Sequence, residues 1–264
     1  MKRIKTARLL ATVLASGLTL PAWAQAIDEL PEELFQVDVA SDLGKFIRRE
    51  LPEGASANPV YLDPIYNPNL YINQDAQVTL TFLDEGAGFR NSLGYFTYQA
   101  DTFVGLTHSD IDLNGRNGIS YNELTTAVEG VGGGLLLPNS SRLNAGGLLE
   151  PGDSIMLGGG EVYSAGTYVG FFLIQNAWRS GAVKGYSDSS EPLTFYTVDM
   201  LNPENQASND LVSSSLGPNN RHVAMLFNGQ GQDNIIMGFE DLKRPWGDND
   251  FNDAVFRLHS NPIE

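Results

Sequence analysis

The pattern of apolar and polar residues predicts that most of this chain forms short β-strands. Residues 78–82 read Val-Thr-Leu-Thr-Phe, and this alternation is typical of a strand with one buried face. Clusters of Gly, Asn, Asp and Pro, which favour turns, separate further apolar runs. These runs predict strands at residues 95–98, 154–157, 167–174, 193–198, 223–227, 234–239 and 254–258. Roughly eight or nine short strands indicate an all-β fold, an antiparallel, jelly-roll-like β-sandwich.

A short helix is predicted before the first strand, at residues 41–50. Ser41 is a candidate N-cap, and Pro52 stops the helix. One face of this helix would be apolar, through Leu43, Phe46 and Ile47. The following segment, residues 59–70, contains three prolines, which predict extended chain laid over a surface instead of a central strand.

A second helix, the one short internal helix of the sandwich domain, is predicted from a capping box. Ser120 and Glu123 have the Ser-x-x-Glu spacing that satisfies two backbone N–H groups at a helix start. The helix would end at about Val128.

The chain divides into a leader, an extension and one domain. Residues 1–24 have the pattern of a signal peptide, with basic residues, an uncharged apolar run and an Ala-x-Ala cleavage pattern. The apolar run is shorter than the ~20 residues of a membrane-spanning helix, and we expect no membrane span in the mature chain. Residues 25–69 would be an N-terminal extension and residues 70–264 the β-sandwich domain. These features predict a secreted or periplasmic protein.

Charge and cysteine content exclude some partners and one source of stability. The formal net charge is −16, and removal of the signal peptide takes away four basic residues and no acidic one. Such a chain lacks the Lys and Arg clusters that bind phosphate, so we expect no nucleic-acid partner. The chain has no cysteine, hence no disulfide. Stability must therefore come from the core or from a metal ion.

Acidic and amide side chains are concentrated between the last two predicted strands. The candidate metal ligands are Glu240, Asp241, Asp248, Asp250, Asn252 and Asp253. Carboxylates this close raise each other's pKa and destabilise the fold unless a cation lies among them. Oxygen ligands without His or Cys favour a hard ion, and a flexible loop suits calcium better than magnesium. The alternative is a solvated acidic turn.

The spacing of these residues also suggests how they would be arranged. In extended chain, Asp248, Asp250 and Asn252 would face one side and Asp253 the other. Glu240 or Asp241 could return from the preceding strand to complete the set of ligands.

The same loop carries a resemblance to a known family. Gly-Phe-Glu-Asp at residues 238–241, a short spacer and Asp-Asn-Asp-Phe-Asn-Asp at residues 248–253 resemble the signature of the bacterial DUF4114 family, a domain of unknown function. Residues 81–95 resemble the opening strand of that family, so the likeness spans about residues 70–258. The resemblance supports an acidic site, but it assigns no activity, and both calcium binding and enzymatic use of the acids agree with it.

Two further residues are candidates because of this resemblance. It implies that Glu85 and Asn91 lie near the acidic loop, either as further ligands or as residues that contact the ligands. The alternative is that Asn91 caps the turn after the first strand and that Glu85 is solvated.

A second candidate ion site lies at residues 112–123, which partly fit the twelve-residue EF-hand loop. The sequence departs from that pattern at Arg116, where an oxygen ligand is expected, and Gly118 is one place late. The candidate ligands here are Asp110, Asp112, Asn114, Asn117 and Glu123. The capping box is the competing explanation for Glu123, and the two readings are compatible.

Most catalytic templates do not fit. The chain has three histidines and no cysteine, and it lacks the His-Glu-x-x-His and Gly-x-Ser-x-Gly motifs. A glycosidase needs only two carboxyl groups, for which Glu240 and Asp253 are candidates. Trp246, inside the acidic loop, is a candidate contact for a sugar ring or another partner.

These observations predict an exported calcium-binding β-sandwich module. We expect it to be non-catalytic and to bind or adhere to a glycan, a matrix component or a cell-surface protein. Two alternatives stay open: a carboxylate-dependent glycan hydrolase that uses the same acidic cluster, and a purely structural role for calcium with the interaction surface elsewhere.

Overall fold

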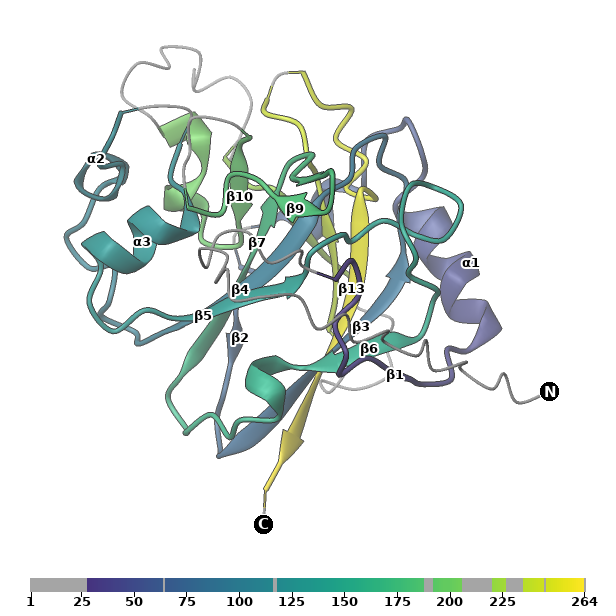
Figure 1. Cartoon of the computed structure of the whole chain (residues 1–264), viewed down its shortest axis with the longest axis horizontal. Helices are drawn as coiled ribbons and strands as arrows, with labels where there is room; N and C mark the ends of the chain where they lie inside the picture. The colour runs from purple at the N-terminus through teal and green to yellow at the C-terminus, as the bar shows by residue number, and fades with distance from the viewer. Residues whose placement is uncertain are drawn as a thin grey trace, which may run out of the picture.

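The computed structural model describes residues 28–63, 65–115, 118–187, 192–205, 220–226, 235–244 and 246–263. The predicted signal peptide lies outside these residues. Within them, none of the helices has the length and apolar character needed to cross a membrane. The predicted antiparallel β-sandwich is confirmed: two sheets face each other, and helices lie outside them (Figure 1).

The first sheet contains the first and last long strands of the domain as neighbours. Its order is β1 (Phe35–Gln36), β6 (Asp153–Met156), β3 (Ala76–Asp84), β13 (Ala254–Pro262), β12 (Ile235–Phe239) and β11 (Val223–Leu226). The second sheet has the order β10 (Thr194–Tyr196), β7 (Tyr168–Ile174), β4 (Ser92–Tyr98) and β5 (Gly132–Leu137), and β2 (Leu70–Tyr71) also pairs with β7. A small hairpin joins β8 (Trp178–Arg179) to β9 (Ala182–Val183).

Helices cover the outer face of each sheet. Helix α1 (Ser41–Glu50) packs on the first sheet, and α2 (His108–Ile111) and α3 (Tyr121–Ala127) pack on the second. Short 3₁₀ helices lie at Pro59–Leu62, Leu157–Gly159, Asp199–Leu201 and Pro203–Asn205. Parts of both sheets are therefore buried on both faces. For this reason Thr81, predicted to face solvent, is 2 % exposed, and its hydroxyl accepts a hydrogen bond from the Ser154 hydroxyl at 2.9 Å.

Most predicted elements are confirmed, and the exceptions have local causes. Strand β5 was missed because it begins with three glycines, which resemble a turn. A side chain at Gly133 would collide with the Tyr95 carbonyl oxygen of the neighbouring strand, so this close pairing requires glycine. The extended chain predicted for residues 59–70 is wrong at its start, where Pro59–Leu62 form a 3₁₀ helix capped by the Asn58 side chain.

The two predicted helices differ in their caps. Helix α3 has the predicted capping box, because Ser120 and Glu123 exchange hydrogen bonds between side chain and backbone. The predicted cap of α1 is wrong: Ser41 is the first helical residue, and the N-cap is Ala40, which provides no side-chain hydrogen bond. Helix α2 is an additional element that the sequence pattern did not predict.

The packing of β12 against the acidic loop provides a test of this fold. A Cβ atom at Gly238 would collide with the backbone carbonyl of Phe251, whereas one at Gly88 would meet no atom within 4 Å. We therefore expect Gly238→Ala to lower the free energy of unfolding by about 1–3 kcal/mol. Gly88→Ala, the matched control, should change it by less than about 0.5 kcal/mol. Urea unfolding measures both, and equal effects would contradict the described contact.

Candidate metal centre

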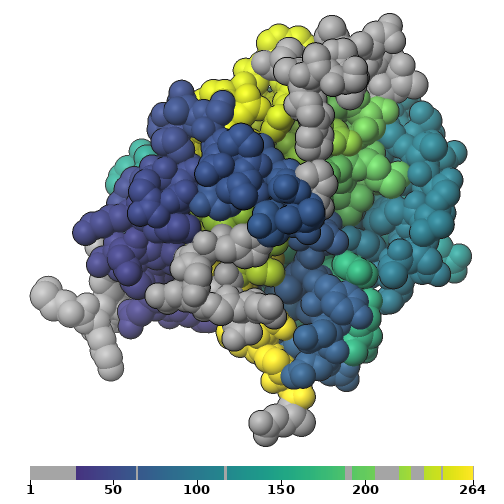
Figure 2. Space-filling model, turned by 180° about the vertical axis from the view of Figure 1, so that it is seen from behind, coloured from purple at the N-terminus to yellow at the C-terminus, as the bar shows by residue number. Residues whose placement is uncertain are grey.

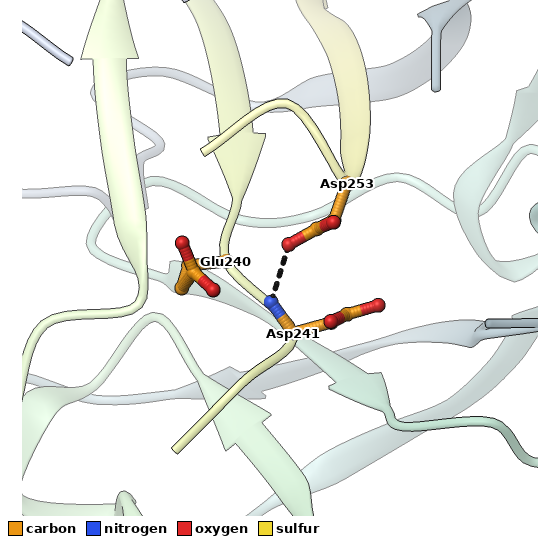
Figure 3. A group of neighbouring side chains, drawn as sticks. All are labelled: Glu240, Asp241 and Asp253. Carbon is orange, nitrogen blue, oxygen red and sulfur yellow. Dashed lines mark hydrogen bonds between the residues drawn. The ribbon is translucent and has the colours of Figure 1, made fainter. Parts of the chain in front are cut away.

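The acidic residues come together because a β-hairpin holds both ends of their loop. Phe239, the last residue of β12, pairs with Ala254, the first residue of β13. Glu240 and Asp253 therefore face each other immediately beyond the paired strands. The backbone N–H of Asp241 donates a hydrogen bond to the Asp253 carboxylate at 2.8 Å (Figure 3).

The backbone of Glu240 is fixed by the neighbouring strand β11. Its N–H donates to the carbonyl oxygen of His222 at 3.0 Å. Its own carbonyl oxygen lies 2.9 Å from His222 Nδ1, which must be the donor because a carbonyl only accepts. His222 is fully buried and stacks on Phe195 with ring centroids 4.1 Å apart. The backbone at Glu240 is thus held by a buried residue of the core.

The loop beyond Glu240 is not extended, and this prediction from the sequence is wrong. Asn249 and Phe251 have left-handed backbone conformations, with φ of 63° and 56°. The Phe251 side chain is fully buried against α1 and the first sheet. The change of direction at these two residues brings Asp248 and Asp250 to Glu240. The Asn252 side chain lies elsewhere, and its Nδ2 donates to Glu53 Oε2 at 3.2 Å.

Two groups of three carboxylates result, and they share one member. Glu240, Asp241 and Asp253 form the first group, and Glu240, Asp248 and Asp250 form the second. In each group, one oxygen per residue lies within 4.8 Å of the others. Five of the six predicted ligands are therefore brought together in the structure.

The two residues implied by the family resemblance lie beside the first group. Asn91 is 1 % exposed, and its Nδ2 donates to Asp241 Oδ2 at 2.6 Å. Asn91 Oδ1 in turn accepts from the N–H of Asn176 at 2.8 Å, which holds the amide in place. Glu85 is 3 % exposed and forms an ion pair with Arg142 at 3.7 Å. Asn91 thus contacts a candidate ligand directly, and Glu85 is close enough for Asp241 to influence its pKa.

Burial and mutual repulsion raise the pKa of these acids. Burial is the larger cause for Glu240, whose pKa is raised to about 7, with Asp248 and Asp241 adding to the effect. Burial also raises the pKa of Asp241 to about 6 and that of Asp253 to about 9. The pKa of Asp250 is raised for the same reason. Without a cation, the fold therefore disfavours the charged forms of these groups.

One oxygen at the centre of the cluster lacks a protein partner. The Glu240 side chain is fully buried, and within the described part of the chain its Oε2 has no hydrogen bond. From the described residues, its Oε1 accepts only a long bond, 3.3 Å, from the N–H of Leu242. Buried carboxylate oxygens are normally satisfied, since leaving one unpaired costs several kcal/mol. A bound cation at this place would remove that cost.

The two groups of oxygens could hold a metal ion, and their spacing is compatible with calcium. Calcium binds oxygen ligands at roughly 2.3–2.6 Å, so two ligands on opposite sides of the ion lie about 4.8 Å apart. The oxygens of each group satisfy this limit. The ligand atoms are all oxygen, which selects a hard cation.

The second candidate ion site has a different arrangement. The carboxylates of Asp110 and Glu123 accept hydrogen bonds from the backbone and hydroxyl groups of Thr107 and Ser120 respectively. Asp112 Oδ1 accepts from the N–H of Gly115 at 2.8 Å. Asn114 is exposed, and Asn117 lies outside the described residues. Among the residues that the structure describes, these acids form no group comparable to that of the hairpin loop.

Several contacts of the loop come from residues that the sequence did not single out. The N–H of Gly54 donates to Asp250 Oδ2 at 2.9 Å, and the N–H of Ala57 donates to the carbonyl of Asn249 at 2.8 Å. We call residues 53–57 the N-terminal clamp. Figure 2 shows the N-terminal extension packed beside C-terminal residues on one face of the molecule. No local sequence signal marks these contacts, because the partners are about 200 positions apart.

Comparison with known proteins supports the predicted family for part of the chain. The family model described as "Domain of unknown function (DUF4114)" matches residues 163–261, which include the whole acidic loop. The predicted resemblance is therefore confirmed there. The resemblance was predicted from about residue 70 onward, and for residues 70–162 it stays a prediction. Neither a curated protein nor a solved structure matches the chain.

Proposed function

We propose that this protein is an exported calcium-binding module that uses the β12–β13 loop as its metal site and is not an enzyme. The observation that carries the proposal is the fully buried Glu240 carboxylate, which lacks a hydrogen bond at Oε2 among the described residues and belongs to both carboxylate groups. A calcium ion would neutralise the repulsion between these acids and fix the shape of the loop.

The glycan-hydrolase alternative would use Glu240 and Asp253 as its carboxyl pair. Such a reaction requires both groups to reach a sugar ring. Full burial of Glu240 favours an ion, which needs little space, over a sugar. The hydrolase alternative also leaves the three other acids of the two groups without a role.

Calcium should stabilise the protein strongly. An ion that binds only the folded state adds about 2.7 kcal/mol at a hundredfold excess over Kd, which corresponds to roughly 5–10 °C for a domain of this size. We expect the unfolding midpoint in chelator to rise by this amount when calcium is added, and the rise to be smaller in Asp248→Ala/Asp250→Ala, which lacks two of the candidate ligands. Calorimetry at pH 7.5 tests this. If the unfolding midpoint did not respond to calcium or magnesium, the proposal would be contradicted. The glycan-hydrolase alternative would then be tested next, by enzyme assays.

The partner of the module would bind near Trp246. This side chain is 67 % exposed within the metal-binding loop, whereas Trp178 is 7 % exposed. An exposed aromatic ring on a loop ordered by calcium suits a glycan or a protein surface. On a glycan array, we expect binding to require calcium and to be lost in Trp246→Ala with the unfolding midpoint unchanged. Binding that persists in chelator, or in this variant, would place the interaction surface elsewhere.

A further inference from the structure

The two carboxylate groups meet at Glu240, and each is supported by a different part of the fold. In the first group, Asn91 donates to the Asp241 carboxylate, and Gln175 Nε2 donates to the Asp241 carbonyl at 2.7 Å. In the second group, the Asp250 carboxylate accepts from Gly54 of the N-terminal clamp and from the N–H of Asn252 at 3.1 Å. Each group is thus held by its own set of protein contacts, and Glu240 is the only residue they share.

The Glu240 carboxylate is able to serve both groups. A carboxylate has two oxygens with about four lone pairs. Oε2 has no hydrogen bond among the described residues, and Oε1 has only the long contact with Leu242. Gly247 lies against this carboxylate, since a Cβ atom there would collide with Oε1. Because Gly247 has no side chain, the loop passes close to the Glu240 carboxylate without supplying a side-chain partner. Both oxygens are therefore able to bind metal ions within the cluster.

The charge of the cluster favours more than one cation. Five carboxylates belong to the two groups, and a single divalent ion offsets two of their charges. The Arg244 guanidinium, close enough for Glu240 to influence its pKa, makes its contacts with other groups: it donates to the Arg221 carbonyl at 3.2 Å and lies 5.3 Å from the Phe251 ring centre. Within the described residues, no ion pair joins Arg244 or Lys243 to the five acids.

We infer that the loop binds two calcium ions bridged by the Glu240 carboxylate. One ion would have Asp241 and Asp253 as its further ligands, and the other would have Asp248 and Asp250. Ions that share a carboxylate typically lie about 3.5–4 Å apart. This inference rests on the proposed function and adds to it the number of ions and the role of the central residue.

Counting the bound ions tests the inference. The mature protein, freed of metal by chelator, is equilibrated with calcium and its bound calcium per chain is measured by dialysis and elemental analysis. We expect two ions in the wild-type protein. Asp248→Asn and Asp253→Asn should each retain one, the double variant none, and Glu240→Gln should lose both. Asp42→Asn, which alters an exposed acid on α1, should retain two.

The possible outcomes separate this inference from the proposed function. One ion in the wild-type protein overturns the two-ion arrangement and leaves the calcium module intact. No bound ion overturns both. Two ions in the wild-type protein with one retained in Glu240→Gln overturn the bridging role alone. Far-UV circular dichroism of each variant in calcium shows whether a lost ion reflects a lost ligand or an unfolded chain, and Asp241→Asn provides a second variant of the first group.

Discussion

The Glu240→Gln variant is expected to be more stable than the wild-type protein in chelator and less stable in calcium. The reason lies in the burial of this carboxylate, which raises its pKa from 4.5 to about 7. Above pH 7 the ion-free protein must keep the group charged or unfold, at a cost of roughly 3 kcal/mol. A glutamine has no charge, and its amide can donate to the neighbouring carboxylates. In calcium the sign reverses, because the variant loses the central ligand.

The pH dependence of this difference follows from the direction of the pKa shift. A carboxyl group whose pKa is higher in the folded state binds its proton more tightly there, so the free energy of unfolding falls as pH rises from about 4.5 to about 7. The gain in Glu240→Gln should therefore be small at pH 5 and complete at pH 8. Urea unfolding in chelator at both pH values measures it. A variant that is less stable at pH 8 in chelator would show that the Glu240 carboxylate has a stabilising partner in the ion-free protein.

Phe251→Ala is expected to have the largest effect on stability of any substitution in the acidic loop. Phe251 is fully buried against α1 and the first sheet, and truncation of a buried phenylalanine costs about 3–5 kcal/mol. The same side chain holds the left-handed turn that brings Asp248 and Asp250 to Glu240. We therefore expect calcium affinity to fall together with stability.

Trp246→Ala is the matched control for this prediction. It removes an aromatic ring from the same loop, but that ring is 67 % exposed, so the free energy of unfolding should change by less than about 0.5 kcal/mol. Calcium titration followed by chemical unfolding separates the two variants. If both lost stability equally, the loop would not be anchored through Phe251.

The sequence predicted the elements with strong local patterns. Alternation identified β3, apolar runs between turn residues identified most other strands, and the Ser120–Glu123 spacing identified α3. Strand β5 was not recognisable, because its glycines are required by a close approach to β4 that only the folded sheet reveals. Burial of the outer faces of the sheets could not be predicted either, since the helices that cover them are distant in sequence.

The acidic site was predictable in composition but not in shape. Carboxylates at the ends of two adjacent strands had to approach each other, and Glu240 and Asp253 do so. Alternation in extended chain wrongly placed Asp248, Asp250 and Asn252 on one face. A left-handed conformation is usually predicted from a glycine, but here it occurs at Asn249 and Phe251. Burial of the Phe251 ring compensates for the conformational cost.

The N-terminal clamp has a consequence for the biosynthesis of the protein. Gly54 and its partner Asp250 are 196 positions apart, so the clamp cannot form until nearly the whole chain has been made. Contacts this distant form late and slowly. Until then α1 lacks this loop, and Leu83 lacks Phe251 and Val255, the C-terminal members of its apolar cluster. The segment around residue 250 thus determines when the N-terminal helix is secured, and a chain truncated before residue 248, which also lacks β13, should aggregate instead of folding.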